Sequence, residues 1–154
     1  MSESPLRSKN FVTAKIVSQA CQIARGELKT IELGNLEVRR DWGCASEFMY
    51  AVMLCLKQQT PSDYLIATGN TSSLGDFLEF TFAALNLDYR DYLVSQERLF
   101  RPLDIKQTLC DVSQTSDYLG WSAKKSLQDV VNGMVKAEMN LHRPRLTPVQ
   151  QLAN

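Results

Sequence analysis

Four arginines in two irregular segments are the residues best suited, by type and spacing, to bind an anion. Arg39 and Arg40 lie in one segment, and Arg98 and Arg101 lie in the other. A guanidinium group matches two phosphate oxygens at once, so arginines that converge from separate loops could clamp a diphosphate. Lys15, on a predicted helix, could add a further positive charge. Recognition of a phosphorylated ligand is therefore one interpretation of these residues.

An alternative interpretation is that the arginines form surface ion pairs with nearby acids. Arg40 directly precedes Asp41, and Arg101 lies three residues before Asp104. Exposed pairs of this kind contribute little to stability and need no ligand. Spacing alone favours this interpretation. In a ligand site, by contrast, Asp104 or Glu37 could accept hydroxyl hydrogens from a sugar.

Side chains for covalent or redox chemistry are poorly represented in the chain. The single histidine, His142, lies in a proline-containing segment near the end, so a Ser-His-Asp or Cys-His arrangement has no support. Cys44 precedes a predicted helix whose dipole could stabilise a thiolate, but a packed or capping cysteine is the simpler interpretation. No glycines have dinucleotide-fingerprint spacing, and no tyrosine has a lysine four residues later. We therefore predict no catalytic residue in this chain.

The elements that must position these residues alternate between helices and short strands. Apolar spacing predicts helices over residues 10–25, 45–56, 73–85, 111–120 and 126–139. Shorter apolar runs predict strands over residues 30–33, 64–67 and 92–94. Ser73 with Asp76, and Ser126 with Asp129, have the spacing of capping boxes. The chain is therefore predicted to be an α/β protein, mostly helical, with about three short strands.

The helix predicted over residues 45–56 is apolar on two faces. Phe48 and Val52 belong to a stripe at helical spacing, and Leu54 and Cys55 add apolar surface on the other side. Three strands are fewer than the ~5–6 of an average sheet, so the chain has little with which to cover both faces. We expect another domain to cover this helix.

Composition restricts the class of protein further. The chain has 154 residues, with 17 basic and 17 acidic side chains, so no overall charge draws it to nucleic acid or to a membrane surface. The longest apolar stretch is too short to span a membrane, and the first residues do not resemble a signal peptide, which predicts a cytoplasmic protein. Four scattered cysteines indicate neither a zinc site nor disulfides. We expect one domain over residues 1–139 and a flexible tail over 140–154.

Five motifs give the chain a family resemblance. In order, they are ESPLRSKNFVTAKI, GNLEVRRDWG, YLIATGNTSSLGDF, RLFRPLDI and DYLGWSAKKSLQDVV. Together they resemble the C-terminal, substrate-binding half of the GDP-mannose 4,6-dehydratases, which are extended Rossmann-type short-chain dehydrogenases/reductases. The resemblance runs from about Glu3 to Glu138. It implies conversion of GDP-mannose to GDP-4-dehydro-6-deoxymannose with NADP, in an enzyme whose dinucleotide-binding half is absent from this chain.

The resemblance also implies roles for individual residues, and it reverses the preference for surface ion pairs. Arg40 and Arg101 match residues at the diphosphate and nucleoside end of the substrate. Lys15 and Asn35 match positions near the nucleotide. Asp104 stands where the family has a glutamate expected to bond sugar hydroxyls.

At the start of the chain, the resemblance assigns a cofactor contact. Arg7 matches the second arginine of the family's Glu-Ser-Pro-Arg-Arg segment, which approaches a cofactor phosphate and the subunit interface, whereas Leu6 replaces the first. Cys44 stands where the family usually has histidine. We expect the chain to be inactive alone and to need a Rossmann half, or a full-length dehydratase subunit in a homo-oligomer. The alternative is a non-catalytic GDP-sugar-binding or subunit-interaction protein derived from the dehydratase, so its status as an enzyme stays open.

Overall fold

The computed structural model describes residues 1–99 and 105–141, and they form helices joined by short strands. The α-helices are α1 Val12–Ala24, α2 Ala45–Leu56, α3 Leu74–Ala83, α4 Ser113–Leu119 and α5 Leu127–Leu141. The strands are β1 Ser2–Glu3, β2 Ile31–Leu33, β3 Arg39–Arg40, β4 Gly43–Cys44, β5 Ser72–Ser73 and β6 Leu93–Ser95. Short 3-10 helices are η1 Tyr89–Asp91 and η2 Glu97–Leu99. Arg101, Asp104 and His142 lie outside the described residues.

The strands pair two by two. β1 runs parallel to β4, β2 runs parallel to β6, and β3 runs antiparallel to β5. The strands predicted over 30–33 and 92–94 are confirmed as β2 and β6. The strand predicted over 64–67 is wrong: Leu65 is half-exposed, and its N–H donates to Thr115 Oγ1 rather than to a neighbouring strand. An apolar run becomes a strand only where another strand lies beside it.

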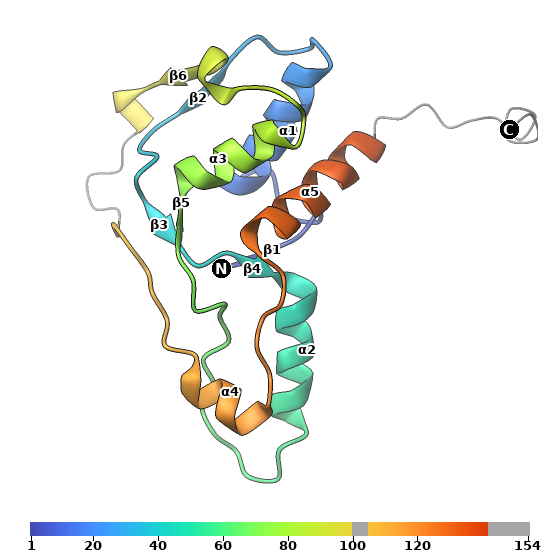
Figure 1. Ribbon diagram of the computed structural model, residues 1–154, viewed down its shortest axis with the longest axis vertical. Coiled ribbons are helices and arrows are strands. Elements are labelled where there is room, and N and C mark those ends of the chain that lie inside the picture. The colour runs from blue at the N-terminus through green and yellow to red at the C-terminus, as the bar shows by residue number, and fades with distance from the viewer. Residues whose placement is uncertain (100–104, 142–154) are drawn as a thin grey trace, which may run out of the picture.

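The main core lies where α1, α3 and α5 meet beside β2 (Figure 1). Its buried side chains are those of residues Ile16, Val17, Ala20, Ile31, Leu33, Trp42, Leu74, Phe77, Leu78, Phe82, Val130, Val131, Met134 and Val135, with Cys21 and Ile23. Most of these residues lie in the predicted helices, whereas Ile31 and Leu33 come from β2 and Trp42 lies between β3 and β4. Packing among α1, α3 and α5 therefore forms the core against which β2 lies.

Local capping explains where α3 and α5 begin and where α1 ends. Ser73 Oγ accepts the N–H of Asp76 at 2.9 Å, and Asp76 Oδ2 accepts the N–H of Ser73 at 2.7 Å, which confirms the predicted capping box of α3. The corresponding bonds at Ser126 and Asp129 precede α5. At the end of α1, Gly26 adopts a left-handed φ of 76°, a conformation that glycine adopts without steric cost.

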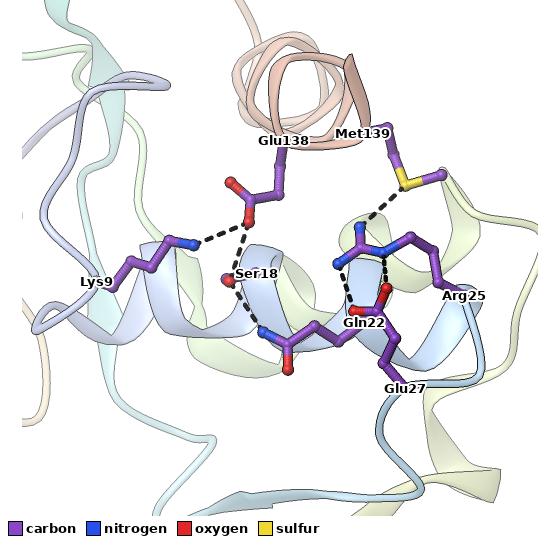
Figure 2. A network of polar contacts seen from close by, with 7 residues as sticks. All are labelled: Lys9, Ser18, Gln22, Arg25, Glu27, Glu138 and Met139. Carbon is purple, nitrogen blue, oxygen red and sulfur yellow. Dashed lines mark hydrogen bonds and ion pairs between the residues drawn. The ribbon is translucent and has the colours of Figure 1, made fainter. Parts of the chain in front are cut away.

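Polar contacts fasten the end of α5 to α1, as Figure 2 shows. Glu138 Oε1 accepts hydrogen bonds from Lys9 Nζ and from Ser18 Oγ, each at 3.0 Å. Nearby, Arg25 Nη1 lies 3.9 Å from the sulfur of Met139. These contacts hold the last turns of α5, which continues as a helix to Leu141.

Helix α2 projects away from this core, beside α4 (Figure 1). Phe48 and Ala51 are buried against Trp121, whereas Met49 is 60% exposed and Leu56 is 82% exposed. The helix predicted over 45–56 is confirmed residue for residue. Its exposed side chains belong to the stripe that includes Val52, whereas Leu54, on the other side, packs against the buried cluster with Trp121. Within the described residues, no helix is long and apolar enough to cross a membrane.

Candidate functional site

A cavity of about 510 Å³ opens between the start of α1, β2 and β3, and we call it the α1–β2 cavity. Its volume falls within the ~300–1,000 Å³ typical of small-molecule sites. It is lined by Met1, Asn10, Phe11, Val12, Lys15, Glu32, Leu33, Gly34, Asn35, Val38, Arg40, Trp42, Leu74 and Leu99. The cavity is thus mainly apolar, with a few charged groups at defined places.

Three of the predicted substrate-binding residues line this one cavity. Lys15 comes from α1, Asn35 from the turn after β2, and Arg40 from β3. The fold therefore brings together residues that lie in different elements and up to 25 positions apart, from 15 to 40. Of the other predicted residues, Arg7 is not among those lining the cavity.

The ammonium group of Lys15 is hydrogen-bonded to an uncharged backbone oxygen. Its Nζ donates to the backbone carbonyl oxygen of Glu32 at 2.9 Å. A carbonyl oxygen orients the ammonium group without cancelling its charge. Lys15 can therefore still attract an anion that enters the cavity.

Arg40 is held by backbone oxygens. Its Nη1 donates to the carbonyl oxygen of Ile105 at 2.6 Å and to that of Arg39 at 2.8 Å. The adjacent Asp41 carboxylate is buried and accepts the backbone N–H groups of Thr68 and Gly69, at 3.0 and 2.9 Å. Asp41 therefore organises the loop that precedes β5, while Arg40 reaches the cavity.

The apolar walls of the cavity include residues that sequence reasoning missed. Phe11 and Val12 are partly exposed at the start of α1, and Trp42 forms part of the wall while only 5% exposed. Trp42 packs edge-on against Phe77, with ring centroids 5.5 Å apart. Among the described residues its Nε1 has no hydrogen-bond partner. Tryptophan inside the Arg-Asp-Trp-Gly motif was the available signal, since such a ring offers both a packing surface and a donor.

Arg7 belongs to a neighbouring cluster. Its guanidinium lies 3.6 Å above the ring centroid of Phe11, and its Nε lies 3.7 Å from Glu3 Oε2. Thr13 Oγ1 donates to the same carboxylate oxygen at 2.9 Å. Burial raises the pKa of the Glu3 carboxyl, although the Thr13 hydrogen bond and the charge of Arg7 oppose this shift. Arg7 is thus held beside the cavity rather than inside it, because its contacts are with Phe11 and Glu3.

Cys44 is the N-cap residue of α2, and its thiol differs from that of Cys21. Burial on its own raises the pKa of Cys44, but hydrogen bonds, led by that of Ser46, lower it overall. Lys125 Nζ, 3.4 Å from the sulfur, is one of these donors. Burial raises the pKa of Cys21 to about 11. Among the described residues, no group of three or more potential ligands could hold a metal ion.

Comparisons with known proteins agree on one family. A family model described as GDP-mannose 4,6 dehydratase matches residues 1–134. GDP-mannose 4,6 dehydratase 2 of Arabidopsis thaliana is 36% identical over 139 residues, which are 90% of this chain and 37% of that protein. GDP-mannose 4,6 dehydratase of Drosophila melanogaster is 33% identical over 158 residues, covering 92% of this chain and 40% of that protein. The chain thus spans about two fifths of the length of these relatives.

Solved structures share the fold at low sequence identity. RMD from Pseudomonas aeruginosa, complexed with NADPH, has a TM-score of 0.83 and 15% identity, covering 91% of this chain and 46% of that one. MoeE5, in complex with UDP-glucose and NAD, has a TM-score of 0.75 and 19% identity, covering 92% of this chain and 45% of that one. In both cases the similar region is less than half of the solved chain.

Proposed function

We propose, since the chain belongs to the GDP-mannose 4,6-dehydratase family, that its α1–β2 cavity binds the nucleotide end of GDP-mannose or a related GDP-sugar. The chain would be the substrate-binding half of a dehydratase that forms GDP-4-dehydro-6-deoxymannose, and it would be inactive alone. The observation that carries the proposal is the meeting of Lys15, Asn35 and Arg40 at one cavity.

The fold supports this role. Solved structures share this fold over less than half of their own length, which supports the prediction that the chain is one half of an extended Rossmann-type short-chain dehydrogenase/reductase. Within that fold, Lys15 and Arg40 approach from α1 and β3, so a diphosphate between them would meet two cations. The apolar walls at Phe11 and Trp42 suit the planar base of a nucleotide, because contact between an aromatic side chain and the base removes apolar surface of both from water.

Arg101 and Asp104 remain in the proposal on the family resemblance alone. Arg101 would contact the diphosphate, and Asp104 would accept sugar hydroxyls through a side chain shorter than glutamate. Their segment follows Leu99, which lines the cavity wall.

The cofactor enters the proposal only through Arg7. We propose that Arg7 reaches a phosphate of NADP from its position over Phe11. One guanidinium and one ring do not form a dinucleotide site, and the sequence has no glycine-rich turn to accommodate a pyrophosphate. The residues present therefore do not fit the whole cofactor, and no hydride step is assigned to this chain.

The exposed face of α2 supports a protein partner. Its exposed apolar side chains are Met49, Tyr50, Val52, Met53 and Leu56. A contiguous apolar face of this kind is typical of an interface. Solved relatives with the same fold have more than twice the matched length, so we propose that a Rossmann half or a dehydratase subunit covers this face. We also propose a cytoplasmic location. All four cysteines are free thiols, as is usual for proteins of that reducing compartment.

A second candidate function is a non-catalytic one, favoured by the same α2 face. Here the chain would bind a GDP-sugar or dock on dehydratase subunits without taking part in turnover. Incubation of the chain with GDP-mannose and NADP, alone and with a Rossmann half, separates the candidates. Product that forms only when both halves are present supports the first candidate, and no product in either mixture supports the second. Formation of the 4-keto product by the chain alone would contradict both.

Calorimetric titration with GDP tests the site directly. We expect Arg40→Ala and Lys15→Ala each to weaken GDP binding about tenfold or more, because each loses a charge-assisted contact with phosphate. The matched control is Arg90→Ala, since Arg90 is an exposed arginine paired with Asp88 and is not among the cavity residues. If the Arg40 and Lys15 variants bind GDP as tightly as the control does, the site assignment is wrong.

A further inference from the structure

Glu32 connects two cations at the mouth of the α1–β2 cavity. In β2 the flanking residues Ile31 and Leu33 are buried, and Glu32 faces outward. Its backbone oxygen accepts Lys15 Nζ at 2.9 Å, and its Oε2 accepts Arg98 Nη2 at 2.8 Å. Glu32 itself lines the cavity. One acidic residue therefore lies between Lys15, a proposed phosphate ligand, and Arg98, an arginine that the proposed site does not include.

The backbone next to Arg98 is fixed at the cavity wall. Arg98 lies in η2, directly after β6, and the N–H of Gln96 donates to the carbonyl oxygen of Leu33 at 2.9 Å. The neighbouring Leu99 lines the cavity, and its carbonyl group packs so closely on Gly34 that a Cβ there would lie 2.7 Å from the oxygen. The main chain of η2 is therefore held beside the cavity, while the Arg98 side chain extends from it into solvent.

The ion pair between Arg98 and Glu32 is easily exchanged. The side chains are 69% and 46% exposed, and an ion pair in water contributes little. A diphosphate offers Arg98 more negative charge than one carboxylate, together with pairs of oxygens that match the guanidinium fork. Until the Glu32 carboxylate is neutralised, it also repels an anion that enters the cavity.

We propose that Arg98 is a further phosphate-binding residue of the α1–β2 cavity and that Glu32 is the internal anion holding it while the cavity is empty. The incoming diphosphate takes the place of the Glu32 carboxylate on Arg98. This inference rests on the proposed function, because it assumes that the cavity receives the diphosphate of a nucleotide. It predicts that replacing Arg98 weakens the binding of a diphosphate, whereas replacing Glu32 strengthens it.

Calorimetric titration of the full chain with GDP, inorganic pyrophosphate and guanosine tests this proposal. We expect Arg98→Ala to weaken the binding of GDP and pyrophosphate roughly tenfold, because a charge-assisted contact is lost and Glu32 is left unneutralised. We expect Glu32→Gln to tighten both about two- to fivefold, because Arg98 is released and the repulsion is removed. Guanosine has no phosphate, so its affinity should be the same in both variants. Arg90→Ala, which removes the arginine of another exposed pair, is the control.

The outcomes separate this inference from the proposed function. If the wild-type chain binds neither GDP nor pyrophosphate, both fail. If the wild-type chain binds GDP and Arg98→Ala binds it as tightly as Arg90→Ala does, only the role of Arg98 is wrong. If Glu32→Gln weakens GDP binding, Glu32 positions the cations instead of competing with phosphate, and the exchange is refuted. Weakened guanosine binding by Arg98→Ala would show a general structural effect and would also overturn the proposal.

Discussion

Substitution of Gly34 by alanine should destabilise the chain through one close backbone contact. A Cβ at position 34 would lie 2.7 Å from the carbonyl oxygen of Leu99 and 2.9 Å from its carbonyl carbon. Both atoms belong to the main chain of η2, so no side-chain rotation relieves the overlap. The matched control is Gly133→Ala in α5, where the new Cβ meets no atom within 4 Å.

The expected changes in the free energy of unfolding have opposite signs. A forced backbone shift costs about 1–3 kcal/mol, and the reduced freedom of the unfolded chain offsets about 0.4–1 kcal/mol of it. Gly34→Ala should therefore lower the free energy of unfolding by about 1–2 kcal/mol. Gly133 is exposed within a helix, where alanine is favoured over glycine, so Gly133→Ala should gain about 0.5–1 kcal/mol.

Thermal and urea unfolding followed by circular dichroism can measure this difference. A gap of about 2 kcal/mol between the variants corresponds to about 4–8 °C in melting temperature for a chain of this size. Because Leu99 lines the α1–β2 cavity, Gly34→Ala should also weaken GDP binding, whereas Gly133→Ala should not. If Gly34→Ala were as stable as Gly133→Ala, the close approach of Leu99 to Gly34 would be refuted.

Three further predictions follow from buried charge, exposed surface and capping. Burial raises the pKa of Glu3 above its ordinary value of 4.5, so the folded state retains a proton there that the unfolded state loses, and stability falls as pH rises from 4.5 towards the raised pKa. Glu3→Gln should reduce this fall in pH-dependent urea unfolding, whereas Glu37→Gln, at an exposed site, should leave it unchanged. Met49→Ser and Leu56→Ser should lower the binding of a hydrophobic dye to the chain and its self-association in ultracentrifugation; unchanged dye binding would mean that another surface binds the dye. Ser73→Ala should cost about 1 kcal/mol in thermal unfolding by removing the cap of α3, and an unaltered melting temperature would contradict that role.

The helices were predictable because their signals are local. The stripe that includes Phe48 and Val52 predicted α2 with its observed bounds, and the Ser73 and Ser126 caps lie within three residues of their partners. Spacing along one helix and bonds between near neighbours need no knowledge of the rest of the fold. Lys15, Asn35 and Arg40 were also named from the sequence, although their shared cavity was not visible there.

Pairing and proximity were decided by tertiary structure. The run at 64–67 has the composition of a strand but no adjacent strand in the described chain, whereas Arg39 and Arg40 form a strand because Ser72 and Ser73 lie opposite them. Glu32 gave no signal in the sequence, since only the pairing of β2 with β6 places it against Arg98. The sequence alone determined which segments are helical and which family they resemble. Which side chains face the same cavity depended on contacts between distant segments, and only the folded chain defines those contacts.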